Sequence, residues 1–95
     1  VTGIAVQEVN WLGDGAVADA PAQGWPIRAR VRSTRPPAPG RFWPLEGARG
    51  RVVLDEPEAG VAPGQACVFY AEDGQRVLGG GWITGTGQGD LVSAA

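Results

Sequence analysis

The stretch Ile27-Arg28-Ala29-Arg30-Val31-Arg32-Ser33 decides the fold class, because apolar residues and arginines alternate strictly along it. Successive side chains of a β-strand point to opposite faces of a sheet. Ile27, Ala29 and Val31 therefore share one face, and the three arginines share the other. The pattern predicts a half-buried strand, with one face packed on the core and the other in solvent.

Other segments with β character accompany this strand: residues 2–9, 41–45, 51–54, 66–70 and 76–84. In the first of them, Ile4, Val6 and the aliphatic part of Glu8 are expected on one face. Val9 is expected on the opposite face, and Asn10 is expected to begin the break after the strand. The sequence thus predicts short strands along most of its length.

Glycine and proline mark the turns between these strands. Residues 46–50 are expected to join two strands in a hairpin. Residues 62–65 fit a type II turn, because Pro63 presets φ at the second position and Gly64 accepts a positive φ at the third. The pair Asp73-Gly74 predicts another hairpin, with a type I′ turn.

Two connections are expected to be longer. Residues 35–40 contain three prolines, which cannot donate ladder hydrogen bonds. They are therefore expected to end the preceding strand and to run as an extended connector. Residues 16–26 show no helical periodicity and are expected to form a surface loop that Trp25 holds down.

The composition agrees with short strands and tight turns, since the 95 residues are 43% hydrophobic and include 16 Gly and 8 Pro. A small sheet hides its edges most fully by closing. We therefore expect an all-β fold: a small closed or nearly closed six-stranded antiparallel barrel, Greek-key-like, over residues 1–84. Gly79-Gly80-Gly81 is expected at the barrel seam, where close backbones exclude side chains. A flexible C-terminal tail is expected over residues 85–95.

The sequence argues against several classes of function. A single Cys and no His disfavour a disulfide or a metal site, and no apolar run is long enough to span a membrane. Cys67 is expected in the core as a small hydrophobe. The acidic residues Asp55, Glu56 and Glu58 are expected in a solvated turn. No catalytic or metal-binding residue is assigned, and a chain that begins at Val1 is expected to be a fragment of a larger protein.

The arginine row has a specific electrostatic consequence. All 8 basic residues are Arg, although the formal net charge is -2. Side chains at positions i and i+2 lie on the order of 7 Å apart along a strand, a spacing suited to following a phosphate backbone. The alternative is a solvated outer face whose arginines pair with carboxylates. The candidate RNA-binding residues are Arg28, Arg30, Arg32 and Arg35.

Four blocks of residues occur in a specific order. They are Asn10-Trp11-Leu12, Arg30-Val31-Arg32, Gly64-Gln65-Ala66-Cys67-Val68-Phe69-Tyr70 and Leu78-Gly79-Gly80-Gly81-Trp82-Ile83. Together they resemble the C-terminal barrel of the tRNA-specific 2-thiouridylase family. The resemblance extends over nearly the whole chain, to about Ile83.

The resemblance implies a cytoplasmic parent sulfurtransferase. Such an enzyme activates the wobble uridine of tRNA with ATP and replaces the 2-oxygen by sulfur from a cysteine persulfide, supplied through a sulfur-relay protein. In the family the ATP loop and the working cysteines belong to upstream domains of the same chain. This fragment is therefore expected to be non-catalytic, to hold no cofactor and to position the tRNA.

The resemblance also bears on single residues. Cys67 matches a variable position, so no catalytic role is carried onto it. Arg30 and Arg32 match the basic strand of the family. Val31 stands where members often have an aromatic residue, which puts a stacking role of this strand in doubt but leaves a phosphate role possible.

An alternative function is a protein-interaction barrel of the translation-factor or aminomethyltransferase type, with no RNA contact. Its mark would be an exposed apolar patch that includes Trp11, Trp25 or Trp43. The tryptophans, with Trp82, are scattered singly along the sequence. That spacing favours anchoring of the core or of loops over base stacking.

Overall fold

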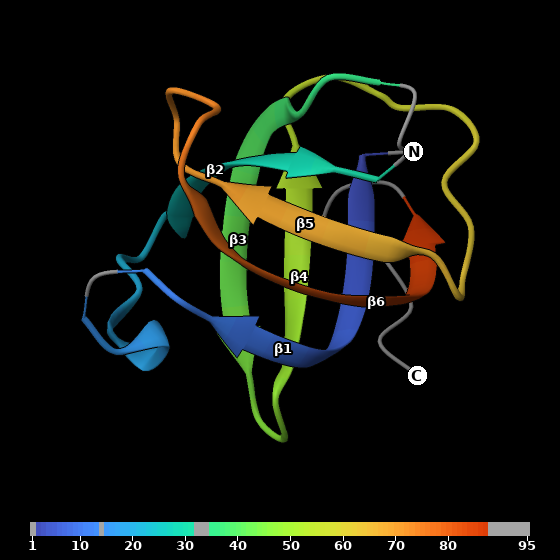
Figure 1. The fold of residues 1–95 in the computed structure, drawn as a ribbon. Helices are drawn as coiled ribbons and strands as arrows, with labels where there is room; N and C mark the ends of the chain where they lie inside the picture. Colours follow the sequence, from blue (N-terminus) through green and yellow to red (C-terminus); the bar gives the residue numbers. More distant parts are fainter. Residues whose placement is uncertain (1, 14, 32–34, 88–95) are drawn as a thin grey trace.

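The computed structural model describes residues 2–13, 15–31 and 35–87, which form a closed antiparallel barrel (Figure 1). Its strands are β1 (Gly3–Trp11), β2 (Trp25–Arg30), β3 (Ala38–Leu45), β4 (Arg49–Leu54), β5 (Ala66–Tyr70) and β6 (Val77–Gly87). Their order around the barrel is β1-β4-β3-β2-β5-β6. Because β2, β3 and β4 are consecutive neighbours while β1 lies beside β4, the topology is a Greek key. The predicted six-stranded barrel is confirmed.

Alternate residues of each strand fill the inside of the barrel. Ile27 and Ala29 of β2 are buried, whereas Arg28 and Arg30 are half-buried on the outer face. Val31, directly after β2, is also buried. The alternation predicted for this segment is therefore confirmed from Ile27 to Val31, although the strand begins two residues earlier than predicted, at Trp25, and Arg32 and Ser33 lie outside the described residues. The core consists of Ile4, Val6, Ile27, Ala29, Val31, Phe42, Val52, Leu54, Cys67, Phe69 and Ile83.

Aromatic rings form a continuous row through this core. The ring centroids of Trp25 and Trp11 lie 5.2 Å apart, and those of Trp11 and Phe42 lie 5.9 Å apart. Phe42 in turn lies 4.6 Å from Phe69. Aromatic pairs at such distances contribute beyond the area they bury. Residues that are far apart in the sequence thus meet in one cluster.

A β-bulge in β1 makes the predicted facing of that strand wrong beyond Gln7, whereas Ile4 and Val6 lie together in the core as predicted. Between Gln7 and Asn10 the strand advances three residues while its partner β6 advances two, and Glu8 adopts a φ of 52°. An extra residue in one strand reverses the alternation beyond it. Glu8 is therefore exposed, while Val9 and Trp11 pack against the core. The strand also continues through Asn10 instead of breaking there.

Proline enters the strands further than predicted. β3 begins at Ala38, and Pro39 pairs with Arg28 of β2. The expected connector over residues 35–40 is therefore too long. Pro39 is near the start of its strand, and its carbonyl oxygen still accepts a hydrogen bond of 3.0 Å from the N–H of Asp55. Proline is tolerated at such positions because only its donor is missing.

The loop between β1 and β2 contains a short 3-10 helix, Val17–Asp19, that the sequence did not predict. The indole N–H of Trp25 donates a hydrogen bond of 2.9 Å to the carbonyl oxygen of Val17. The predicted anchoring of this loop by Trp25 is therefore confirmed. Trp43 anchors the same loop from β3, since its indole N–H donates to the carbonyl oxygen of Ala22 at 3.0 Å.

Of the two predicted turn types, one is confirmed and the other is wrong. Gly64 has a φ of 90° and the N–H of Gln65 donates to the carbonyl oxygen of Ala62, as a type II turn requires. The β5–β6 hairpin exists, but a type I′ turn needs positive φ at both central residues, and of the pair Asp73-Gly74 only the glycine has it. The N–H of Gly74 donates to the carbonyl oxygen of Ala71, so the turn is centred one residue earlier.

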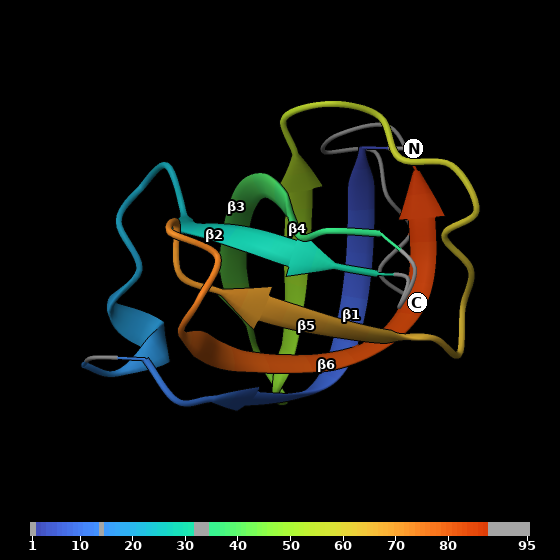
Figure 2. The same cartoon turned by 45° about the horizontal axis from the view of Figure 1, so that its top comes forward.

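The three glycines lie where β6 passes between β5 and β1, and Figure 2 shows β6 curving along β5 and then turning up beside β1. A Cβ atom on Gly79 would overlap the carbonyl oxygen of Asn10 in β1, and one on Gly80 would lie 2.5 Å from the carbonyl oxygen of Cys67 in β5. The seam is therefore where it was predicted. The strand continues to Gly87, three residues beyond the expected end of the barrel at 84, and the rest of the expected tail, 88–95, lies outside the described residues.

Candidate nucleic-acid interface

The outer face of β2 presents Arg28 and Arg30 between strands β3 and β5. Arg28 pairs with Pro39 on one side and with Tyr70 on the other, and Arg30 pairs with Val68. None of these neighbours carries a charge. The two guanidinium groups therefore stand on a surface without cross-strand carboxylate partners.

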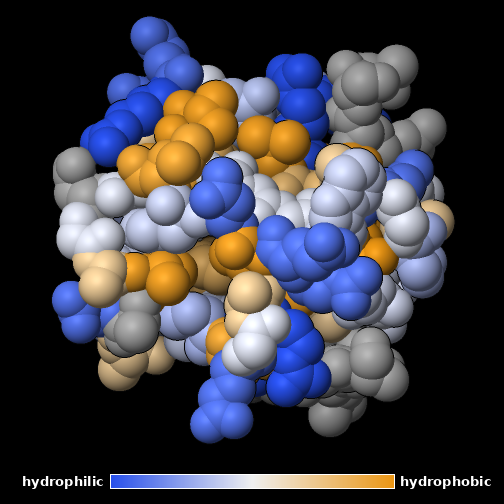
Figure 3. All heavy atoms as spheres, turned by 60° about the horizontal axis from the view of Figure 1, so that its bottom comes forward, coloured by the Kyte–Doolittle hydropathy of each residue, from blue (hydrophilic) through white to orange (hydrophobic). Residues whose placement is uncertain are grey.

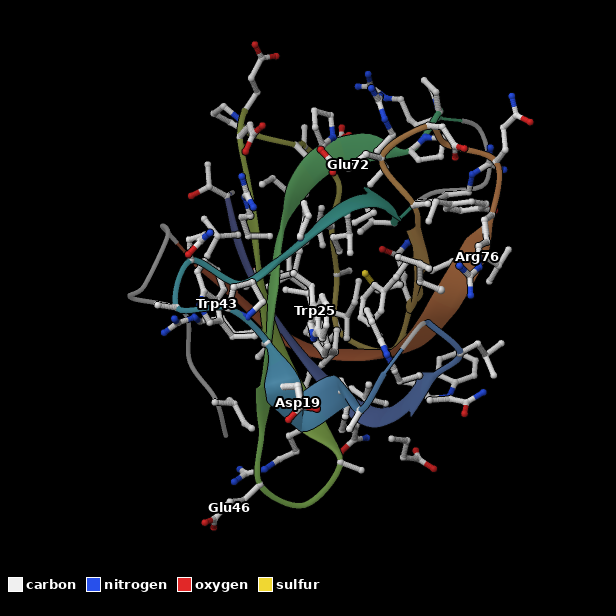
Figure 4. All side chains as sticks on the ribbon, turned by 90° about the vertical axis from the view of Figure 1, so that its left-hand side faces the viewer. Asp19, Trp25, Trp43, Glu46, Glu72 and Arg76 are labelled. Atoms are coloured by element: carbon white, nitrogen blue, oxygen red, sulfur yellow. The ribbon has the colours of Figure 1, made fainter. Side chains whose placement is uncertain are left out.

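Arg28 is partly held by the protein. Its Nε donates a hydrogen bond of 2.6 Å to the backbone carbonyl oxygen of Glu72, which lies near one end of the barrel in Figure 4. This bond uses one of the five N–H donors of the guanidinium group. A pocket of about 90 Å³ opens beside it, and its lining includes Arg28, Arg41, Asp55 and Glu72. The pocket thus brings together two arginines with two carboxylates at its rim.

Arg30 has an unsatisfied donor. Its Nε is buried and finds no hydrogen-bond partner among the described residues. The guanidinium carbon lies 5.8 Å from the centroid of the Tyr70 ring, within the range of a cation–π contact. A buried N–H without an acceptor costs free energy.

The structure does not place the other two predicted RNA-binding residues, Arg32 and Arg35, together with Arg28 and Arg30. Arg32 lies outside the described residues. Arg35 is 53% exposed and lies 3.6 Å from a carboxylate oxygen of Glu58, whose side chain is 12% exposed. The structure therefore places Arg28 and Arg30 together and gives Arg35 an acidic partner. Such a partner competes with any phosphate for the same guanidinium group.

Three further arginines on the barrel wall were missed as candidates. Arg41 of β3, with Arg49 and Arg51 of β4, lies on the outer face of its strand. The guanidinium carbon of Arg51 lies 4.8 Å from the ring centroid of Trp43. The signal was present in the sequence, because arginines alternate with buried residues in β4 as they do in β2. What the sequence did not show was that the β3–β4 hairpin lies beside β2.

The acidic turn after β4 is largely as predicted. Asp55, Glu56 and Pro57 are exposed, and only Glu58 is partly covered, where it meets Arg35. Within the described residues, no three His, Cys, Asp or Glu side chains group in a way that would hold a metal ion. None of the described residues belongs to a helix that is both long and apolar enough to cross a bilayer.

Cys67 lies in the core beside Phe69, as predicted, and is fully buried. Burial raises the pKa of its thiol from the ordinary value of 9.0 to about 12, because desolvation disfavours the thiolate. The thiolate is the reactive form of cysteine. The position therefore suits a packing residue.

Cys67 should accordingly resist thiol reagents in the folded chain. At pH 8 we expect Ellman's reagent to leave the native protein unmodified and to titrate one thiol once urea unfolds it. Because the pKa is higher in the folded state than in the unfolded state, the contribution of this group to stability is complete below about pH 9 and is lost as the pH rises toward 12. Rapid labelling without urea would contradict the assigned burial.

The tryptophans count against the alternative of a protein-interaction barrel. Trp11 and Trp25 pack against the core, and Trp43 is half-buried against the β1–β2 loop. Trp82, which is 49% exposed, is the exception and does not anchor the core. In Figure 3, apolar residues on the face shown form patches separated by polar ones. None of Trp11, Trp25 and Trp43 therefore forms the exposed patch that would mark the alternative.

The sequence that forms this closed Greek-key barrel matches a known class of domain. Residues 1–83 match the family model of the aminomethyltransferase beta-barrel domain. Because the match covers most of the chain, the chain belongs to this family.

Individual relatives define a narrower group. The chain is 56% identical over 87 residues to a protein of Maricaulis maris, covering 90% of the chain and 20% of the relative. It is 56% identical over 84 residues to a protein of Parvibaculum lavamentivorans (87% and 21%), and 50% identical over 80 residues to one of Ruegeria pomeroyi (84% and 21%). All three are named tRNA-specific 2-thiouridylase MnmA. The resemblance to that family is thus confirmed, and the chain spans about a fifth of the length of these relatives.

Proposed function

We propose that this barrel is the non-catalytic tRNA-positioning domain of a tRNA-specific 2-thiouridylase, and that the outer face of β2 contacts the tRNA backbone. The observation that carries the proposal is the position of Arg28 and Arg30 on the outer face of β2, where none of their cross-strand partners carries a charge. The two residues are two positions apart, so their side chains are separated by on the order of 7 Å along the strand. Two such guanidinium groups suit phosphate oxygens, which accept charge-assisted hydrogen bonds.

In this proposal the chemistry occurs elsewhere in the parent enzyme. The upstream domains bind ATP, activate the wobble uridine and transfer sulfur that a relay protein delivers as a persulfide, all in the cytoplasm. The barrel contributes binding alone, which agrees with the inert environment of Cys67. The names of the relatives support tRNA as the substrate of the whole enzyme.

Phosphate contacts hold the RNA in place but carry no sequence information. Arg28 and Arg30 therefore act equally on all tRNA substrates of the enzyme. Arg35 contributes less than they do, since it exchanges its contact with Glu58 for one with RNA. Arg32 stays a predicted contact.

Removing both charges should weaken tRNA binding without slowing the chemical step. In the intact enzyme we expect Arg28→Gln combined with Arg30→Gln to raise KM for tRNA about 10- to 100-fold and to leave kcat nearly unchanged, because contacts shared by the ground and transition states affect KM alone. Initial rates of 2-thiouridine formation measure both constants.

A control is Arg76→Gln, which removes one positive charge by the same substitution from the β5–β6 connection, away from Trp43 in Figure 4. Its KM should stay within about 2-fold of the parent value, since it lies outside the proposed contact. An unchanged KM in the double variant would show that the β2 arginines are only a solvated surface.

A further inference from the structure

Basic and acidic side chains occupy different parts of the barrel, although the formal net charge is only -2. Strands β2, β3 and β4 carry no Asp or Glu at any position. The carboxylates near them lie in turns at the ends of the barrel, and Figure 4 shows Glu46 and Glu72 at opposite ends. The arginines of these three adjacent strands are Arg28, Arg30, Arg41, Arg49 and Arg51.

The strand register places these arginines next to one another. Arg28 is paired with Pro39, so Arg41 is its diagonal neighbour on β3, and both arginines line the same pocket. Arg41 is paired with Val53, so Arg51 is its diagonal neighbour on β4. Diagonal neighbours on one face of an antiparallel pair lie about 7–8 Å apart.

The row continues at both of its ends. Arg30 follows Arg28 by two residues on β2, and Arg49 precedes Arg51 by two residues on β4, each a step on the order of 7 Å. The buried residues of each strand alternate with these arginines, so all of them face outward. We call the row the arginine diagonal: Arg30, Arg28, Arg41, Arg51 and Arg49.

Packing holds part of the arginine diagonal in position. Trp43 is fixed by its hydrogen bond of 3.0 Å to the carbonyl oxygen of Ala22, and the guanidinium group of Arg51 lies over its ring. Nε of Arg49 donates to the carbonyl oxygen of Glu46 at 3.0 Å. A side chain that is already ordered loses less conformational entropy when it binds a ligand.

We propose that the arginine diagonal is one continuous surface for an RNA phosphate backbone, extending the contact of β2 across β3 and β4. The inference rests on the proposed function for the identity of its partner. Arginines at regular positions on three adjacent strands, none of which carries an Asp or Glu, complement a polyanion with regularly spaced charges, although Asp55 and Glu72 line the pocket between Arg28 and Arg41. An acidic protein surface, whose charges are irregularly spaced, fits the row less well.

The part of the arginine diagonal on β3 and β4 can be tested separately from the part on β2. In the intact enzyme, Arg41→Gln combined with Arg49→Gln should weaken the binding of transcribed tRNA with a wobble uridine about 10- to 100-fold, as expected for losing two contacts. Arg41→Lys combined with Arg49→Lys keeps the charge and should recover most of the affinity. Arg76→Gln is the control, and equilibrium filter binding at fixed salt is the measurement.

The outcomes separate the two proposals. If Arg28→Gln with Arg30→Gln weakens binding while the Arg41 and Arg49 variants bind as the parent does, the diagonal is wrong and the β2 contact stands. If neither pair changes the affinity, both proposals are wrong. An equal loss with Arg76→Gln would reveal a general effect of charge and overturn the diagonal. Normal tRNA binding by the Arg41 and Arg49 variants, together with a loss of affinity for the sulfur-relay protein, would also overturn the diagonal, because the surface would then serve a protein partner.

Discussion

Replacing Gly79 with alanine should destabilise the folded chain by at least about 4 kcal/mol. Gly79 has a φ of 140°, a conformation that side chains rarely adopt and that costs on the order of 1–3 kcal/mol. In addition, the new Cβ would overlap the carbonyl oxygen of Asn10, a backbone atom of the paired strand β1. The seam would have to open to relieve that overlap, and small domains have only about 5–15 kcal/mol of stability to lose. Urea unfolding followed by tryptophan fluorescence measures the change.

Gly64→Ala separates the cost of the strained backbone from the cost of the Cβ overlap. Gly64 also has a positive φ, 90°, but an added Cβ there would meet no atom within 4 Å. Its cost should therefore be limited to the strained backbone, about 1–2 kcal/mol. Equal losses at Gly64 and Gly79 would mean that close approach at the seam is not what demands glycine.

Phe42→Ala should destabilise the chain by about 3–5 kcal/mol, the usual cost of removing a buried aromatic side chain. Phe42 is fully buried and lies between the rings of Trp11 and Phe69. Its loss leaves a cavity in the middle of the aromatic row, where rigid strands on all sides limit collapse. Thermal or urea unfolding gives the free-energy change.

Leu45→Ala on the same strand is the control for this substitution. Leu45 is 43% exposed near the β3–β4 turn, so its replacement should change the stability by no more than about 0.5 kcal/mol. A loss at Phe42 no larger than the loss at Leu45 would contradict the assigned core.

The strands could be predicted where buried and exposed residues alternate without interruption. In β2 the alternation of apolar residues with arginines predicted both faces correctly, and Ala66–Tyr70 was predicted with its observed bounds. The glycine run predicted the seam, because consecutive glycines inside a strand are typical of a bulge or a close approach of backbones. These signals are local, so neighbouring residues were enough to read them.

Features that depend on tertiary pairing could not be predicted. The bulge at Glu8 is set by how β1 meets β6, and it reversed the facing of Val9. Pro39 enters β3 because its carbonyl oxygen has a partner after β4, which local sequence does not show. For the same reason the 3-10 turn at 17–19 was missed.

The candidate site was predicted in part. Arg28 and Arg30 were identified because one strand carries both. The ion pair that occupies Arg35 depends on Glu58, which is far along the chain. The neighbouring arginines of β3 and β4 were overlooked because their place beside β2 follows from the Greek-key order of the strands.

The salt dependence of tRNA binding tests most directly whether the wall of this barrel contacts RNA phosphates. Each phosphate that a protein neutralises adds roughly 0.7 to 0.9 to the negative slope of log K against log salt concentration. For the intact enzyme carrying both Arg28→Gln and Arg30→Gln, we expect a slope that is shallower than that of the parent by about 1.4 to 1.8. A double variant with the parent slope and affinity would contradict this expectation.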